Sequence, residues 1–166
     1  MTKQKPTARS TTSLKQLLAD WHRRTRESQF AHYEAVKPLV RANTALGVIA
    51  VTLSTFVGTS LFATLEAQSV PEFRLFIGFV SVLAAVLSSL QTFLRYSERA
   101  EKHRGAAARF GSLRREIEFL QASGAPYDKE RIESLREKMD SISSEAPEIS
   151  GRVWQRTEAM LKARSK

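Results

Sequence analysis

Small and hydroxyl-bearing side chains recur along two uncharged stretches of the chain, residues 42–65 and 75–94. In the second stretch they are spaced by 3, 4, 3 and 4 residues: Gly78, Ser81, Ala85, Ser88 and Thr92. In the first, four threonines lie within about 80° of one another on a helix: Thr44, Thr52, Thr55 and Thr59. Such stripes either let helices pack closely, with hydroxyls bonding between them, or line an uncharged pore once several copies assemble. The residues leave both uses open.

Basic side chains begin where the second stretch ends. Arg95, Arg99, Lys102 and Arg109 are spaced by 4, 3 and 7 residues, which places them on one face of a helix. Long basic side chains just beyond an apolar helix reach anionic lipid head groups, and we favour this interpretation for Arg95 and Arg99. An anionic ligand is the alternative, chiefly for Arg109.

The two uncharged stretches have the length of membrane spans. They contain 24 and 20 residues, and a bilayer core of about 30 Å needs roughly 20 helical residues. The alternative is a pair of buried helices in a soluble bundle, but such helices normally keep a charged face and neither stretch has one. Residues 42–94 are therefore predicted to form a two-helix transmembrane hairpin.

The distribution of Lys and Arg predicts the orientation of the hairpin. Five lie in residues 22–41 and seven in residues 95–115, whereas the nine-residue connection between the stretches holds only Arg74. Because basic flanks stay on the cytoplasmic side, we expect a multi-pass protein of two spans with both termini in the cytoplasm.

The remaining residues predict an all-α protein. We expect a disordered segment over 1–12, a cytoplasmic amphipathic helix over 13–41, and a cytoplasmic antiparallel helical bundle over 95–166. Residues 87–110 lack Gly and Pro until Gly105, so the second span should continue into this bundle as one helix, with Gly105 and the alanines after it packing closely against a neighbour.

Two apolar seams with steps of 3, 4 and 3 residues should form the bundle core. They are Phe110, Leu113, Ile117 and Leu120, and then Ile132, Leu135, Met139 and Ile142. Between them the residues SGAPYD break the helix, with Gly124 as the predicted C-terminal cap and Asp128 as the next N-cap.

The chain carries none of the motifs that enzymes of the common classes require. It has no cysteine, no Gly-rich phosphate loop and no paired metal ligands, and its three histidines are scattered. We therefore expect neither an enzyme nor a cofactor. A membrane-tethered nucleic-acid module would also suit the net charge of +9, but no reading motif accompanies that charge, so no specific nucleic acid is expected.

The order of these features resembles the SLATT domain, a two-transmembrane effector family associated with prokaryotic nucleotide-signalling immunity. The likeness covers roughly residues 14–162 and rests on RYSERAEKHRGAAARFGSLRREIEFL, with Ala100, His103, Ala107 and Phe110, and on Pro147 to Trp154. It implies a homo-oligomeric pore in the bacterial inner membrane, released by a cytoplasmic sensor protein or a nucleotide second messenger. The competing interpretation is a non-conducting membrane scaffold that recruits a cytoplasmic partner.

Overall fold

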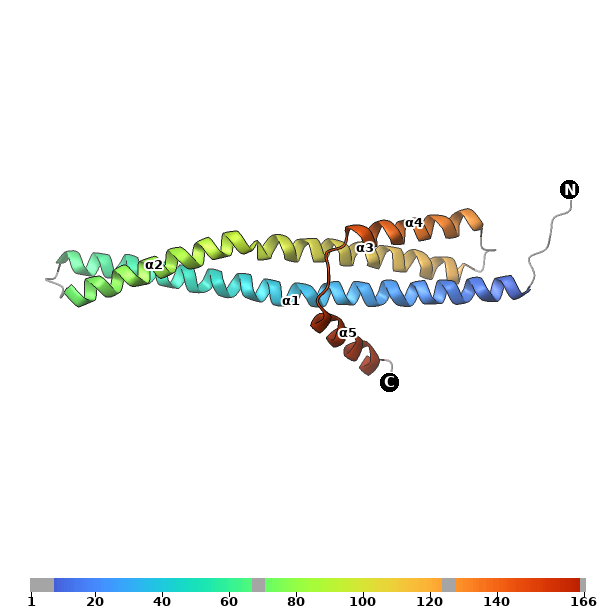
Figure 1. Cartoon of the computed structure of the whole chain (residues 1–166), viewed down its shortest axis with the longest axis horizontal. Coiled ribbons are helices and arrows are strands. Elements are labelled where there is room, and N and C mark those ends of the chain that lie inside the picture. The colour runs from blue at the N-terminus through green and yellow to red at the C-terminus, as the bar shows by residue number, and fades with distance from the viewer. Residues whose placement is uncertain (1–7, 67–70, 124–127, 165–166) are drawn as a thin grey trace. The chain divides into compact units, whose positions relative to one another are not determined.

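The computed structural model is built of five α-helices, and no strand occurs among the residues it describes (Figure 1). The backbone is described over residues 8–66, 71–123 and 128–164. The helices are α1 (Ala8–Glu66), α2 (Pro71–Leu94), α3 (Tyr96–Ala122), α4 (Lys129–Glu145) and α5 (Gly151–Arg164). The predicted all-α class is confirmed.

Helix α1 is longer than the sequence predicted. It begins at Ala8, so residues 8–12 of the segment expected to be disordered are helical, and residues 1–7 lie outside the described part. Once a helix is nucleated, each further residue costs little, and the Ser and Thr residues here are only weak helix formers rather than breakers. The same helix runs through Pro38 and joins the predicted segments 13–41 and 42–65.

The predicted continuity between the second span and the following helix is wrong at one residue. Helix α2 ends at Leu94, Arg95 adopts φ of +48°, and α3 begins at Tyr96. A left-handed residue after a last helical residue is a common way of ending a helix, although Gly or Asn usually occupies it. The carbonyl of Arg95 then accepts a hydrogen bond from the Arg99 N–H at 3.0 Å, which starts α3.

The start of α4 is formed as predicted. Asp128 is its N-cap, in an extended conformation, and its carboxylate accepts a hydrogen bond from the Glu130 N–H at 3.4 Å. This contact satisfies one of the donors that the first turn leaves unpaired. Gly124, the predicted cap of the preceding helix, lies outside the described residues.

The chain divides into two compact units, residues 1–36 with 101–166 and residues 37–100. In the first unit α3 and α4 lie alongside the N-terminal part of α1, and side chains of all three helices share one hydrophobic core (Figure 1). Leu18 and Trp21 of α1 are buried in it. All eight predicted seam residues belong to this core or pack against it: Phe110, Leu113, Ile117, Leu120, Leu135 and Ile142 are buried, and Ile132 and Met139 are partly buried.

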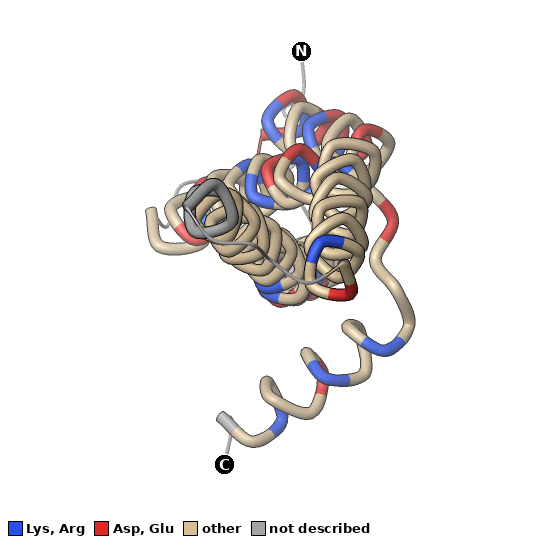
Figure 2. The backbone as a smooth tube through the Cα atoms, turned by 90° about the vertical axis from the view of Figure 1, so that its left-hand side faces the viewer, with Lys and Arg blue, Asp and Glu red and all other residues tan. Residues whose placement is uncertain are grey.

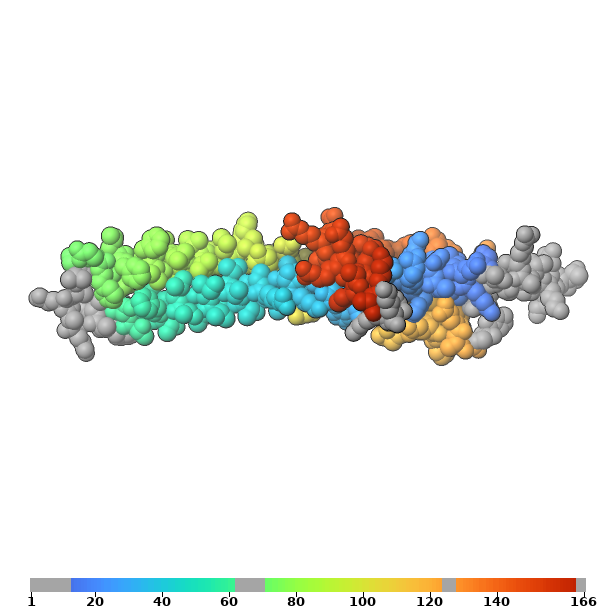
Figure 3. All heavy atoms as spheres, turned by 90° about the horizontal axis from the view of Figure 1, so that it is seen from below, coloured from blue at the N-terminus to red at the C-terminus, as the bar shows by residue number. Residues whose placement is uncertain are grey.

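Helix α5 lies against α1 in the same unit (Figure 3). Thr157 is buried, and its hydroxyl donates to the Val153 carbonyl at 3.0 Å. Basic positions recur along this helix, with an acidic one between them (Figure 2). One side of α5 thus packs on the unit and the other keeps its charges in solvent.

A side chain of α1 lies against α3 at Gly111 rather than at Gly105. A β-carbon placed on Gly111 would lie 2.6 Å from Nε2 of Gln29, whereas one on Gly105 would have nothing within 4 Å. The prediction for Gly105 is therefore wrong, although Ala106 and Ala107 next to it are buried. Which small residue faces a neighbour depends on where that neighbour crosses, and the local sequence does not specify the crossing.

In the second unit, the C-terminal part of α1 packs beside α2 (Figure 1). Ala50 and Ser60 of α1 and Val80 and Ala84 of α2 are buried there. The side chain of Gln91 lies against Gly47, where an added β-carbon would be 3.1 Å from its Nε2. Phe56 and Phe76 meet edge to face with ring centroids 6.5 Å apart. Small residues at such contacts allow close packing of two apolar helices.

Candidate functional site

Both helices of the second unit are long and apolar enough to cross a membrane, and most of their side chains are exposed in the single chain. Only 11% of the most apolar 18-residue window of each is buried. Large apolar side chains stand outward along α2, including Leu75 at 78% exposed, Phe79 at 68% and Phe93 at 83%. The core helices of a soluble protein would be mostly buried, so this exposure fits helices whose apolar faces contact lipid or another chain.

The predicted hydroxyl stripes do not form the contact between α1 and α2. All nine of their residues are exposed in the single chain: Thr44, Thr52, Thr55, Thr59, Gly78, Ser81, Ala85, Ser88 and Thr92. Measured around α1 from the buried Ala50, the threonines lie at about 120–200°, on the side away from α2. Measured around α2 from Ala84, the second stripe lies at about 40–120°.

Four of the five threonine hydroxyls in the stripes donate to carbonyls of their own helices. Thr52 donates to the Val48 carbonyl at 2.8 Å, Thr55 to Val51 at 2.9 Å and Thr59 to Thr55 at 3.0 Å. In α2, Thr92 donates to the Ser88 carbonyl at 3.2 Å. A hydroxyl that donates in this way still offers its lone pairs as acceptors. The two stripes can therefore accept hydrogen bonds from water or from a hydroxyl of another chain.

Four basic residues predicted to meet lipid or an anion have different surroundings. Nε of Arg95 lies 3.1 Å from Oε2 of Glu98, and both side chains are largely exposed. Arg109 donates a hydrogen bond to Oε2 of Glu145 on α4, and this hydrogen bond lowers the pKa of Glu145. Arg99 and Lys102 are exposed on the same helix. Arg109 thus holds α3 to α4, a role that spacing alone did not indicate.

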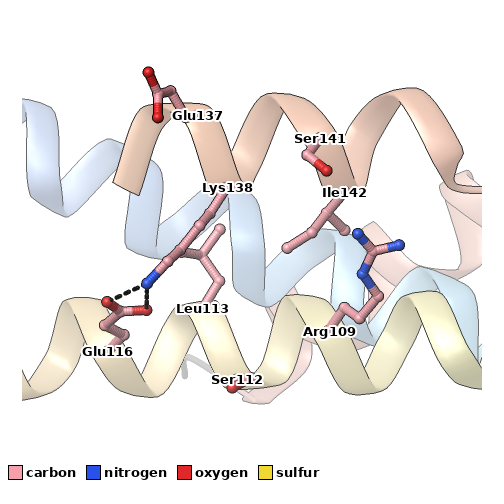
Figure 4. Close-up of a pocket in the computed structure, with 8 residues that line it drawn as sticks. All are labelled: Arg109, Ser112, Leu113, Glu116, Glu137, Lys138, Ser141 and Ile142. Carbon is pink, nitrogen blue, oxygen red and sulfur yellow. Dashed lines mark hydrogen bonds and ion pairs between the residues drawn. The ribbon is translucent and has the colours of Figure 1, made fainter. Parts of the chain in front are cut away.

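A cavity of about 490 Å³ lies between α3 and α4 (Figure 4). Leu113 and Ile142 form its apolar part, and Lys138 reaches across it to the carboxylate of Glu116 at 2.7 and 2.9 Å. Arg109 lies at the other end. Since cations and carboxylates alternate around the cavity, its charge does not select an anion.

Two buried histidines meet where α1 and α3 pack in the first unit. Nδ1 of His32 lies 2.9 Å from Nδ1 of His103, and the rings are tilted with centroids 5.2 Å apart. Burial, and next the charge of His103, lowers the pKa of His32 to about 4. Because the two residues are 71 positions apart, the sequence showed only scattered histidines.

Sequence reasoning also missed Gln91 and the left-handed Arg95. Gln91 is a polar residue within an apolar run, and its amide packs against Gly47 of the neighbouring helix. A single Gln in an uncharged stretch was a signal that could have been used, since amides hydrogen-bond between membrane helices. Arg95 has no such signal, because arginine has no preference for positive φ.

Comparisons of the chain with protein-family models, with curated proteins and with solved structures give no match.

Proposed function

We propose that this chain is an effector of the bacterial inner membrane that oligomerises and permeabilises the membrane when a cytoplasmic signal acts on its helical unit. In this proposal residues 42–65 and 75–94 form a transmembrane hairpin with both termini in the cytoplasm. The first unit forms an antiparallel cytoplasmic bundle of α1, α3 and α4. The excess of Lys and Arg on both flanks of the hairpin supports this orientation.

The exposure of the hydroxyl stripes carries the proposal. If the stripes served only to pack α1 against α2, their residues would be buried between these helices, but all nine are exposed. Their hydroxyls keep acceptor capacity that lipid cannot satisfy. Placed against each other in several hairpins, the stripes would either bond between subunits or face water in a pore. Both arrangements require an oligomer, because one hairpin cannot enclose a channel.

A silent effector also needs an energetic input. Moving a closed-to-open ratio from 99:1 to 1:99 takes about 5.5 kcal/mol of differential binding. The first unit has its own hydrophobic core and an open cavity between α3 and α4, so a partner or small ligand has a surface to act on. The resemblance to SLATT domains favours a sensor protein or a nucleotide second messenger as that input.

The test is dye release from liposomes that contain the full chain, at increasing protein-to-lipid ratios. Ser88→Leu with Thr92→Leu fills the small stripe of α2 with apolar bulk, and we expect release to fall at least tenfold while insertion persists. The control is Val82→Phe with Val86→Phe, which adds apolar bulk to exposed positions outside the stripe and should leave release unchanged.

Two results would contradict the proposal. Equal release by both variants and the unmodified chain would show that the stripe does not face the conducting path. No release from any of them, together with a stable oligomer in the same liposomes, would favour the alternative of a membrane scaffold that recruits a cytoplasmic partner.

A further inference from the structure

The three histidines of the chain have two kinds of partner: His22 contacts a carboxylate, whereas His32 and His103 contact each other. Nε2 of His22 lies 2.9 Å from a carboxylate oxygen of Glu118, and this hydrogen bond lowers the pKa of Glu118. His32 and His103, in contrast, face each other. His32 is 2% exposed and His103 is 8% exposed, so neither ring is well hydrated. A proton added to His32 or His103 therefore faces another histidine ring instead of a carboxylate.

The geometry of the pair requires at least one neutral ring. At an Nδ1–Nδ1 distance of 2.9 Å, one Nδ1–H donates and the other Nδ1 accepts through its lone pair. If both rings are protonated, two N–H groups and two positive charges face each other and the hydrogen bond is lost. Phe110 stacks on His32 with centroids 5.6 Å apart and an interplanar angle of 16°, so an apolar ring covers one side.

Few charged groups face this pair. The positions one turn away from His32 on the same face of α1 are uncharged: Ser28, Gln29, Ala35 and Val36. Glu34, two residues along, points to the opposite side of the helix. The positions one turn away from His103 on α3 are Arg99, Ala100, Ala106 and Ala107, of which only Arg99 is charged. The charged Glu101, Lys102 and Arg104 lie on other sides of the helix. Helix α4 contributes Glu145, which is bound to Arg109, and α5 contributes Trp154 near Phe110, with the exposed Arg152 and Arg156 beside it in sequence. Burial and the charge of His103 are the causes that lower the pKa of His32, and no carboxylate of the described residues acts on that ring to offset a second proton.

We infer that His32 and His103 form a proton-sensitive contact between α1 and α3, which holds the first unit together when neutral and opens when the cytoplasm is acidified. The contact lies within the first unit. His32 is five residues before the part of α1 that belongs to the second unit, and His103 is three residues after the part of α3 that belongs to it. Protons are thus a regulatory input to this unit, and the inference does not depend on membrane permeabilisation.

The direction of the effect follows from the pKa of His32. It lies at about 4, below the ordinary value of 6.5, so the folded contact binds the proton more weakly than the open state does. The stabilisation is present above pH 6.5 and is lost as the pH falls toward 4. Between pH 7.5 and 5.5 the equilibrium for opening the contact should shift by about tenfold.

Hydrogen exchange of the full chain in lipid nanodiscs measures this opening. Amides of residues 25–36 and 101–110 are followed at pH 7.5 and 5.5, with the double variant His32→Leu/His103→Leu at each pH to cancel intrinsic exchange chemistry. Replacing both partners by apolar groups of similar size is close to neutral for folding. We expect the unmodified chain to open about tenfold more at pH 5.5 than at 7.5, relative to the variant. The control His22→Gln should keep this response.

A second measurement needs no variant. In the unmodified chain with ¹⁵N-labelled histidine, nuclear magnetic resonance at pH 7.5 should show one ring with Nδ1 protonated and a second ring with Nδ1 unprotonated and hydrogen-bonded. Two rings that both carry their proton on Nε2, or a pH response that is equal in the unmodified chain and the double variant, would overturn the inference. Loss of the pH response in His22→Gln would assign that response to His22 and would also overturn the inference.

Discussion

Replacement of Ile117 by alanine tests the core that α1, α3 and α4 share. Ile117 is 0% exposed and lies in the cluster with Leu18 and Leu135. Removing its side chain beyond the β-carbon loses buried apolar surface and leaves a cavity that its neighbours fill only in part. Substitutions of this kind cost about 2–5 kcal/mol, and full burial between three helices places Ile117→Ala in the upper half of that range.

Phe119→Ala is the matched control on the same helix. Phe119 lies two residues further along, is 68% exposed, and should cost less than about 1 kcal/mol when truncated. The measurement is urea unfolding of the full chain in mild detergent, followed by tryptophan fluorescence in a Trp154→Phe background, so that the signal comes from Trp21 in the same cluster. Equal losses for the two variants, or a larger loss for Phe119→Ala, would refute the assignment of the buried face of α3.

Two further predictions concern the junction after α2 and the orientation of the hairpin. Arg95→Gly removes the cost of a non-glycine residue at positive φ, and the exposed pair with Glu98 that it also removes contributes little. It should therefore stabilise the chain by up to about 1 kcal/mol in thermal unfolding. Arg95→Val should destabilise the chain, and the opposite order of stabilities would contradict the left-handed cap. Because the chain has no cysteine, single cysteines report topology directly: in intact cells an impermeant maleimide should label Glu72→Cys, whereas Ser134→Cys should react only after the membrane is opened, and labelling in the reverse pattern would contradict the proposed orientation.

Local periodicity was enough to predict the side chains of the core. Phe110, Leu113, Ile117 and Leu120 recur at steps that a helix places on one face, and the same holds for the seam that begins at Ile132. These patterns depend only on helical geometry, so they could be read without knowing the partner helix. The N-cap at Asp128 was predictable for the same reason, since capping acts within one turn.

Features that depend on distant partners could not be predicted. The His32–His103 contact joins residues 71 positions apart, and nothing near either residue indicates the other. Gly111 rather than Gly105 faces α1, because the crossing point of two helices selects the glycine. For the hydroxyl stripes, the spacing predicted a common face on each helix, but only the positions of Ala50 and Ala84 show that these faces lie outside the contact between α1 and α2.

Single-channel recording of the full chain in planar bilayers tests the central claim most directly. Even a closed-to-open ratio of 99:1 leaves about 1% of assemblies open, and brief openings of single channels are counted individually. The account predicts discrete conductance steps that become more frequent faster than linearly with protein concentration, and that disappear in Ser88→Leu with Thr92→Leu. A chain that inserts and oligomerises in these bilayers but passes no current would contradict it.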